Sequence, residues 1–210
     1  MTPAYPTRLS AALAGGTALI VMITAGLLLR GSAMPPLDLR LTDLLYAPPG
    51  TLTAQLAQLG SAVPLLVILI GLVIVCVRAA RTDRPQFLRA APRFLAVLAA
   101  CPVLLLLQEI IARPGPVHQP NSTYPSGHAI VFGGLVAITA MIVAHRPSPL
   151  GRTVLLIDAV AVIIVCGSRM VLAEHYLSDL IGGLLGVTGI ALLLGGTLGL
   201  IPPQRRPAAA

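Results

Sequence analysis

Two short segments of the chain carry residue types that together can transfer a phosphoryl group. Residues 125–128 read PSGH, and residues 168–179 read SRMVLAEHYLSD. In the second segment His175 and Asp179 are four residues apart, so on a helix they would lie on one face. The carboxylate can then fix the imidazole tautomer and stabilise the positive charge that forms when the other ring nitrogen attacks phosphorus. The spacing therefore predicts a histidine nucleophile with an orienting acid.

The remaining polar residues of these segments are suited to binding a phosphate. Arg169 offers a planar fork of donors that matches phosphate oxygens. Ser126 can cap a helix that starts at Gly127, so that backbone N–H groups face an anion. His128 is placed to donate a proton to a leaving oxygen. Both segments therefore indicate one phosphoryl-transfer site.

These segments resemble the second and third signature motifs of the type 2 phosphatidic acid phosphatase (PAP2) superfamily, which also contains the vanadium haloperoxidases. The third motif matches at every defining position: Ser168, Arg169, His175 and Asp179. The resemblance implies a bacterial integral-membrane lipid phosphatase that works through a phosphohistidine on His175. It also implies that Asp179 orients this histidine, that His128 protonates the departing oxygen, and that water later releases phosphate. The phosphate oxygens would be held by Ser126, Gly127, Ser168 and Arg169, with Arg113 contributing from the first motif.

The first family motif is degenerate. It normally reads Lys, six residues, Arg-Pro, often ending Arg-Pro-Arg-Pro, whereas residues 106–116 read LLQEIIARPGP. All 14 basic residues are arginine, so the motif lysine is missing. Depending on the alignment, its position falls on Leu106 or on Gln108, and in the second case Gly115 replaces the second arginine. One or two phosphate-binding cations are lost, which affects rate and substrate range more than reaction type.

Several residues around this motif have two interpretations. Arg113 either binds phosphate or ends the third span and extends its side chain to the interface. Gln108 can still donate a hydrogen bond, whereas His118 either supplies charge or is an ordinary loop residue. Glu109 and Glu174 would repel a phosphate, so each is expected to point to water or to pair with an arginine.

The composition is that of a polytopic membrane protein. Hydrophobic residues make up 56% of the chain and charged residues 10%, and the mean hydropathy is +0.91. The pattern predicts an all-α bundle of six transmembrane helices in a single domain, residues 1–210. The apolar spans are residues 11–29, 59–77, 94–112, 129–144, 153–167 and 180–201. Six spans argue against the soluble haloperoxidase branch. The fourth and fifth spans are short, and we expect both to extend into the flanking motif residues.

Three segments outside the spans have predicted structures. Residues 37–59 mix charges with leucines and are broken by PPG at 48–50, which predicts two short amphipathic helices at the outer interface. The arginine-rich residues 78–93 are interpreted as a solvated cytoplasmic loop. The tail, residues 202–210, is expected to be disordered.

The arginines predict the orientation. With both termini in the cytoplasm, ten of the 14 arginines fall on the cytoplasmic side, and four fall on the other side: Arg30, Arg40, Arg113 and Arg169. By the positive-inside rule the motifs lie outside the cytoplasm. We therefore expect a multi-pass protein of the inner (plasma) membrane with a periplasmic or extracellular active site. The net charge of +7 is explained by topology and anionic lipid, without a nucleic-acid partner.

The sequence leaves the acceptor and the lipid open. The substrate is a phosphate or diphosphate of polyprenyl, phosphatidic acid or phosphatidylglycerophosphate type. A phosphotransferase or head-group transferase would use the same site, and a non-catalytic lipid-phosphate binding or transport protein would retain it. No cofactor or metal is expected, because no acidic cluster suited to magnesium lies near the motifs. The oligomeric state stays open.

Overall fold

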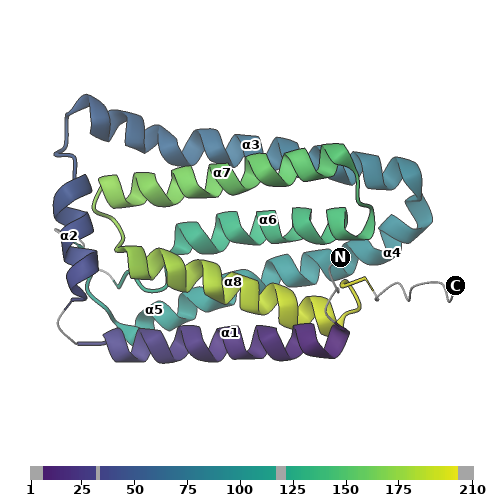
Figure 1. Cartoon of the computed structure of the whole chain (residues 1–210), viewed down its shortest axis with the longest axis horizontal. Helices are drawn as coiled ribbons and strands as arrows, with labels where there is room; N and C mark the ends of the chain where they lie inside the picture. The colour runs from purple at the N-terminus through teal and green to yellow at the C-terminus, as the bar shows by residue number, and fades with distance from the viewer. Residues whose placement is uncertain (1–6, 32–33, 117–121, 203–210) are drawn as a thin grey trace, which may run out of the picture.

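Helices account for the regular structure of the computed structural model, which describes residues 7–31, 34–116 and 122–202 (Figure 1). In chain order they are α1 (Arg8–Leu29), α2 (Pro36–Leu45), α3 (Leu52–Thr82), α4 (Arg84–Ala100), the 3-10 helix η1 (Cys101–Leu105), α5 (Leu106–Ile111), α6 (Gly127–His145), α7 (Pro149–Val171) and α8 (Leu177–Thr197). His118 and the tail from residue 203 lie outside the described residues, and the division into one domain stays a prediction.

The predicted six-span membrane bundle is confirmed. Within the described residues six stretches are long and apolar enough to cross a membrane: α1, α3, the continuous rod of α4, η1 and α5, and then α6, α7 and α8. The fourth and fifth spans extend into their flanking residues as expected, because α6 begins at Gly127 and α7 ends at Val171. Motif residues therefore lie at helix ends, where backbone N–H and C=O groups are free for other partners.

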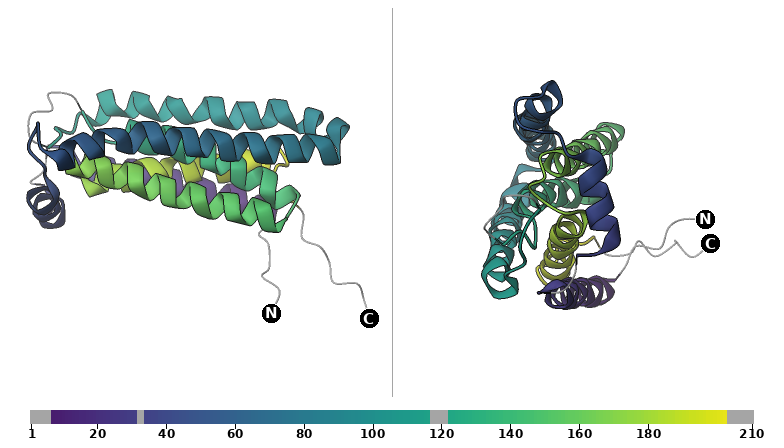
Figure 2. Two further views of the ribbon diagram at one scale, coloured as in Figure 1. Left: turned by 90° about the horizontal axis from the view of Figure 1, so that it is seen from above. Right: turned by 90° about the vertical axis from the view of Figure 1, so that its left-hand side faces the viewer.

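The prediction of two interfacial helices was wrong in number. One short helix, α2, precedes the PPG interruption, and residues from Leu52 onward form the first turns of α3. The Thr51 hydroxyl accepts a hydrogen bond from the backbone N–H of Ala54 at 3.2 Å, which fixes this helix start. Figure 2 shows α2 lying across one end of the bundle, where the ends of the long helices meet.

The interpretation of residues 78–93 as a loop was also wrong. These residues are helical except at Asp83, which joins α3 directly to α4. The Asp83 carboxylate caps α4 through the N–H of Gln86 at 3.0 Å and bonds Arg146 at 2.9 Å. The Gln86 N–H, and then Arg146, lower the pKa of Asp83. Asp83 therefore starts α4 directly after α3, at a point where the many arginines suggested a loop.

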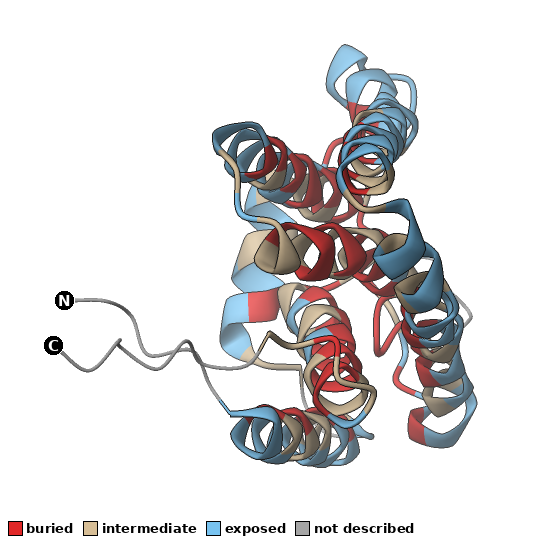
Figure 3. Ribbon diagram, turned by 90° about the vertical axis from the view of Figure 1, so that its right-hand side faces the viewer, coloured by how far each residue is buried: buried red, intermediate tan, exposed pale blue. Residues whose placement is uncertain are grey.

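The burial pattern is that of a helix bundle with a packed interior and an apolar outer surface suited to lipid. Figure 3 shows buried residues on the helix sides that face one another, and exposed residues on the outer sides. Among the spans α6 has the largest buried share, 50% of its most apolar window, compared with 17% for α1. Large apolar side chains such as Leu28 and Leu66 are exposed at 72% and 60%, as expected for positions that contact lipid tails.

Close contact between α1 and α8 rests on glycines. A Cβ atom built at Gly15 would lie 2.4 Å from the backbone nitrogen of Leu193 and 2.6 Å from the carbonyl oxygen of Gly189. Small residues at such crossings let two backbones approach, which is a common basis of helix association in membranes. The neighbouring Gly16 has nothing within 4 Å of the same built atom. Gly15 and Gly16 therefore allow the same substitution to be compared at a tightly packed position and at an open one.

Gly15→Ala should destabilise the bundle, because two backbone groups of α8 must move to admit the methyl group. We expect a lower melting temperature in detergent by about 5 °C, corresponding to roughly 1–3 kcal/mol of overpacking. Gly16→Ala should leave the melting temperature unchanged or raise it, since alanine is the better helix former. Equal melting temperatures for the two variants would contradict the close contact.

Candidate active site

The two histidines of the motifs face each other at the end of the bundle that α2 crosses. The ring centroids of His128 and His175 are 5.9 Å apart, with the rings edge to face. The two segments are also joined through their backbones, since the N–H of Ser126 donates to the carbonyl oxygen of Asp179 at 3.0 Å. Residues 47 positions apart in sequence thus form one cluster, as the sequence predicted.

The start of α6 is built as the PSGH segment predicts. The Ser126 hydroxyl accepts from the N–H of Ala129 at 3.4 Å, and Gly127 is the first residue of the helix. The positive end of the helix dipole therefore lies beside the histidine pair, where it favours an anion. A Cβ atom at Gly183 of α8 would lie 2.8 Å from the carbonyl oxygen of Ser126, so α8 presses directly against this turn.

The spacing predicted that His175 shares a helix face with Asp179, but His175 lies before the helix. It precedes Tyr176, the residue that caps α8. The Asp179 carboxylate instead turns back and accepts the N–H of Tyr176 at 2.9 Å. The Nδ1 atom of His175 lies 3.9 Å from an oxygen of Asp179 and has no hydrogen-bond partner. The i, i+4 pair is therefore brought together by helix capping, at a separation that must shorten for a direct hydrogen bond.

The chain reaches His175 through a left-handed residue. Ala173 has φ +50°, and the N–H of Glu174 donates to the carbonyl oxygen of Arg169 at 2.9 Å. This conformation ends α7 in the way that a glycine often does. Because an alanine occupies the position, the sequence contains no signal for it.

Arg169 lies in the cluster but its donors are occupied by protein groups. It donates to Glu174 at 2.8 Å, to the Ala57 carbonyl oxygen at 3.1 Å and to Ser168 at 3.3 Å. The Glu174 side chain is 30% exposed, whereas that of Arg169 is 7% exposed. Of the two outcomes expected for Glu174, pairing with an arginine is the one found. Its carboxylate stands where a phosphate would compete for the same fork.

Arg113 does not lie where its predicted role in binding phosphate requires. Its side chain is completely buried, and its two terminal nitrogens contact Asp179 at 2.5 Å and Asp38 at 2.9 Å. The guanidinium also lies 4.8 Å from the ring centroid of Tyr176 and donates to Ser178 at 2.7 Å. Arg113 therefore binds Asp179, the predicted orienting acid, and does not face open space, so direct contact with phosphate has no support in this arrangement.

Two further predicted phosphate ligands also contact protein groups. The Gln108 amide donates to the carbonyl oxygen of Pro125 at 2.8 Å, which fixes the turn before the PSGH serine. The Ser168 hydroxyl donates to the Val165 carbonyl oxygen at 2.7 Å and lies against Gly60 of α3. Their arrangement supports positioning roles, and direct binding by either stays a prediction.

Sequence reasoning missed two residues of this cluster. Asp38 is only 3% exposed, yet nothing in the sequence distinguishes it from Asp43 on the same helix. Tyr124 is 1% exposed, and its hydroxyl donates to the Met22 carbonyl oxygen at 2.6 Å. Burial, together with the charge of Asp179, raises the pKa of Tyr124 to about 12. It thus remains a neutral donor that ties the motif loop to α1.

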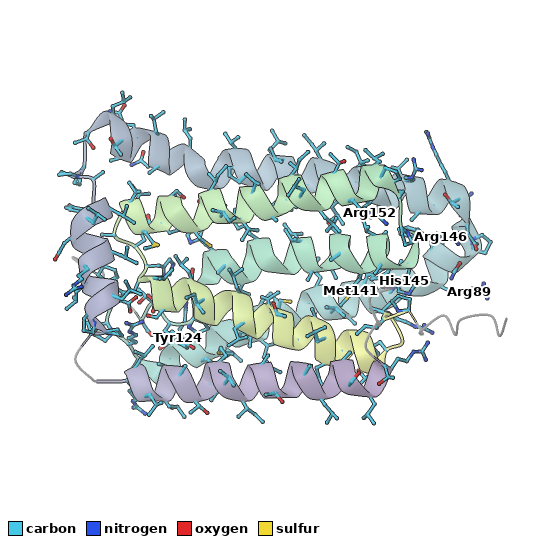
Figure 4. All side chains as sticks on the ribbon, viewed as in Figure 1. Arg89, Tyr124, Met141, His145, Arg146 and Arg152 are labelled. Atoms are coloured by element: carbon cyan, nitrogen blue, oxygen red, sulfur yellow. The ribbon has the colours of Figure 1, made fainter. Side chains whose placement is uncertain are left out.

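Cavities lie at the other end of the bundle. One of about 410 Å³ is bordered by Arg89, His145 and Arg146, and Figure 4 shows these residues far from Tyr124. Nδ1 of His145 is 2.9 Å from the Met141 carbonyl oxygen, and no motif residue lies there. Among the described residues no group of three or more His, Cys, Asp or Glu is arranged to hold a metal ion, and the absence of a metal from the reaction stays a prediction.

Comparison with known proteins agrees with the motifs. A family model described as the PAP2 superfamily matches residues 61–197. The fold is similar to a solved structure described as the first transmembrane PAP2 type phosphatidylglycerolphosphate phosphatase from Bacillus subtilis. The identity is 20%, the TM-score is 0.67, and the match covers 91% of this chain and 98% of the other. No curated protein matches the chain.

Glu174→Gln should increase the affinity for inorganic phosphate, because it removes the carboxylate that now occupies Arg169. We expect a three- to tenfold lower dissociation constant, a modest change since the pair is partly exposed to solvent. Isothermal titration in detergent measures it. Glu109→Gln is the control, because Glu109 is an exposed carboxylate near the first motif. Unchanged affinity in Glu174→Gln would show that Glu174 does not compete with phosphate.

Proposed function

We propose that this chain, which belongs to the PAP2 superfamily and is a phosphoric ester hydrolase, hydrolyses a lipid phosphate or diphosphate through a phosphohistidine on His175. The observation that carries the proposal is the facing pair His128 and His175, 5.9 Å apart beside the start of α6. The candidate substrates are lipids of phosphatidic acid, phosphatidylglycerophosphate and polyprenyl diphosphate type. The Bacillus subtilis relative, described as a phosphatidylglycerolphosphate phosphatase, makes that lipid one of the first to test.

In the first chemical step His175 attacks phosphorus. Its Nδ1 is turned toward Asp179, so Nε2 carries the attacking lone pair. The Nε2–P bond forms while the bond between phosphorus and the lipid oxygen breaks. Protonated His128 gives its proton to that oxygen, and the lipid leaves with one phosphoryl group fewer. Asp179 stabilises the positive charge that develops on the imidazole of His175.

In the second step water releases the phosphate. His128, now neutral, takes a proton from a water molecule whose oxygen attacks phosphorus. The P–N bond breaks, the electron pair returns to Nε2 of His175, and inorganic phosphate departs. His128 is then protonated again, so both histidines are restored for the next turnover.

The phosphate oxygens are held by the α6 N-terminus and by Arg169 in this proposal. Ser126 and the Gly127 amide present donors at the positive end of a helix. Arg169 changes partner from Glu174 to the phosphate, an exchange of one anion for another that costs little in charge. Arg113 and Gln108 act through Asp179 and the PSGH turn, respectively.

The site is proposed to face the periplasm or cell exterior, with both termini in the cytoplasm. Arg89, Arg146 and Arg152 lie at the opposite end from Tyr124 in Figure 4, and the start of α1 at Arg8 packs against Gly196 near the end of α8. An arginine-rich end is retained in the cytoplasm during insertion. This distribution supports an extracytoplasmic site.

His175→Ala should abolish both phosphate release and phosphoenzyme. Purified protein in detergent is given phosphatidic acid, phosphatidylglycerophosphate and a polyprenyl diphosphate without added alcohol acceptor, and free phosphate is measured. The matched control is His145→Ala, since His145 lies at the far end of the bundle, and it should keep near-parental rates. A His175→Ala protein with more than a few per cent of parental turnover would rule out this nucleophile.

The same assay separates hydrolysis from transfer. Release of free phosphate by the parent enzyme, with no lipid alcohol present, identifies water as the acceptor. If the parent forms phosphoenzyme but releases phosphate only after an alcohol is added, the enzyme is a phosphotransferase. Absence of both phosphoenzyme and phosphate from all three lipids would overturn the proposed function.

The topology predicts opposite labelling of two engineered cysteines. Asp43 on α2 and Arg84 at the start of α4 are both exposed, and they lie at the site end and the far end. An impermeant thiol reagent applied to intact cells should label Asp43→Cys and spare Arg84→Cys, whereas both should react after permeabilisation. The reverse pattern in intact cells would place the active site on the cytoplasmic side.

A further inference from the structure

We propose that Asp38 of α2 is a positioning residue that sets the charge around His175 by sharing Arg113 with Asp179. Arg113 bonds one carboxylate with each terminal nitrogen, Asp179 at 2.5 Å and Asp38 at 2.9 Å. The inference deepens the proposed function, because it assigns a role to a residue outside the three motifs.

Asp38 is built into the site through several contacts. Ser178, the residue before Asp179, donates its backbone N–H to one Asp38 oxygen at 3.1 Å and its hydroxyl to the other at 2.5 Å. The side chain of Asp38 is 3% exposed. Buried carboxylates are retained when every oxygen has a donor. Asp38 therefore helps to fix the first turn of α8, the turn that holds Asp179.

The helix that carries Asp38 is itself anchored to the motif elements. Leu41 and Leu45 of α2 pack against the apolar cluster that contains Met170 and Leu180. After α2, the N–H of Ala47 donates to the Val171 carbonyl oxygen at 2.9 Å. An interfacial helix 140 residues away from Ser178 in the sequence thus contacts both α7 and α8 at the site.

The charge balance gives this arrangement a chemical consequence. Two carboxylates and one guanidinium leave a formal charge of −1 in a region where Arg113 and Asp179 have no exposure. Water screens such charges weakly. Without Asp38, Arg113 would neutralise Asp179, and the positive charge that His175 gains on attack would lose its counter-charge. Asp38 keeps that counter-charge available.

The other charged or titratable groups around His175 are known from the same contacts. His128 faces it from α6, Arg169 comes from α7, Glu174 and Tyr176 from the segment between α7 and α8, and Asp179 from α8. Burial raises the pKa of the Tyr176 phenol, so this side chain adds no charge. Arg169 and Glu174 form a pair of zero formal charge. The network of Asp38, Arg113 and Asp179 therefore dominates the net negative charge near His175.

The test compares Asp38→Asn with Asp43→Asn, a carboxylate on the same helix that is exposed. The assay uses whichever of the three lipids above the parent hydrolyses fastest in detergent. Asp38→Asn should lower kcat about 10- to 100-fold, less than the roughly 10²–10³ of a direct transition-state donor, with KM changed less than about threefold. Asp43→Asn should stay within about twofold of the parent.

The pH profile separates a charge effect from a merely structural one. Asp38→Asn makes the surroundings of the nucleophile less negative, so the acid limb of kcat/KM should move to lower pH by about half a unit. Arg113→Gln raises the negative charge and should move the limb to higher pH. The double variant Asp38→Asn/Arg113→Gln restores a formal charge of −1, so its limb should return near the parental position although the rate stays low.

Several outcomes would overturn the inference. Folded Asp38→Asn protein with the rate of Asp43→Asn, or with an unmoved acid limb, excludes the charge role. If Asp38→Asn does not fold, Ser178→Ala gives a second test, because it removes a donor and keeps the charge. Its rate should fall while its limb stays in place, and a moved limb would contradict the proposal. Failure of the parent to hydrolyse any lipid would instead reject the proposed function.

Discussion

The buried carboxylate of Asp179 is the group on which the site depends. One oxygen accepts the N–H of Tyr176 and the other the guanidinium of Arg113, while its backbone carbonyl oxygen accepts the N–H of Ser126. A single residue thus joins α8 to the first-motif loop and to the start of α6. Because removing one partner of a buried ion pair leaves an uncompensated charge, these three segments stay together or separate together.

Hydropathy was sufficient to predict the membrane bundle, but local chemistry decided where each helix ends. The six spans follow from length and composition alone. The errors occurred at caps: Thr51 starts α3 earlier than the apolar run, and Asp83 joins two helices where arginines indicated a loop. A cap is a contact between one side chain and one N–H group, so it changes the mean hydropathy of a span very little.

The motif residues could be found from spacing, whereas their partners could not. His128 and His175 do meet, and Ser126 does cap α6. The predicted role of Arg113 required knowledge of which carboxylates lie near it, and Asp38 is separated from it by 75 residues. Contacts over such distances in sequence are set by how α2 packs across the bundle end, and no local pattern reports this. The left-handed conformation of Ala173 could not be predicted either. Glycine usually adopts this conformation, and an alanine in its place gives no local sequence signal.

The two ends of the bundle respond differently to their surroundings. At the far end Arg146 bonds Asp83 where each side chain is 38% exposed, so dissolved ions weaken the pair. At the site the side chains of Arg113 and Asp179 have no solvent exposure, so dissolved ions screen their pair much less. A rise in ionic strength therefore weakens the pair of Arg146 and Asp83 and affects the pair of Arg113 and Asp179 far less. The position of Asp179 beside His175 should therefore depend little on the salt content of the surrounding medium.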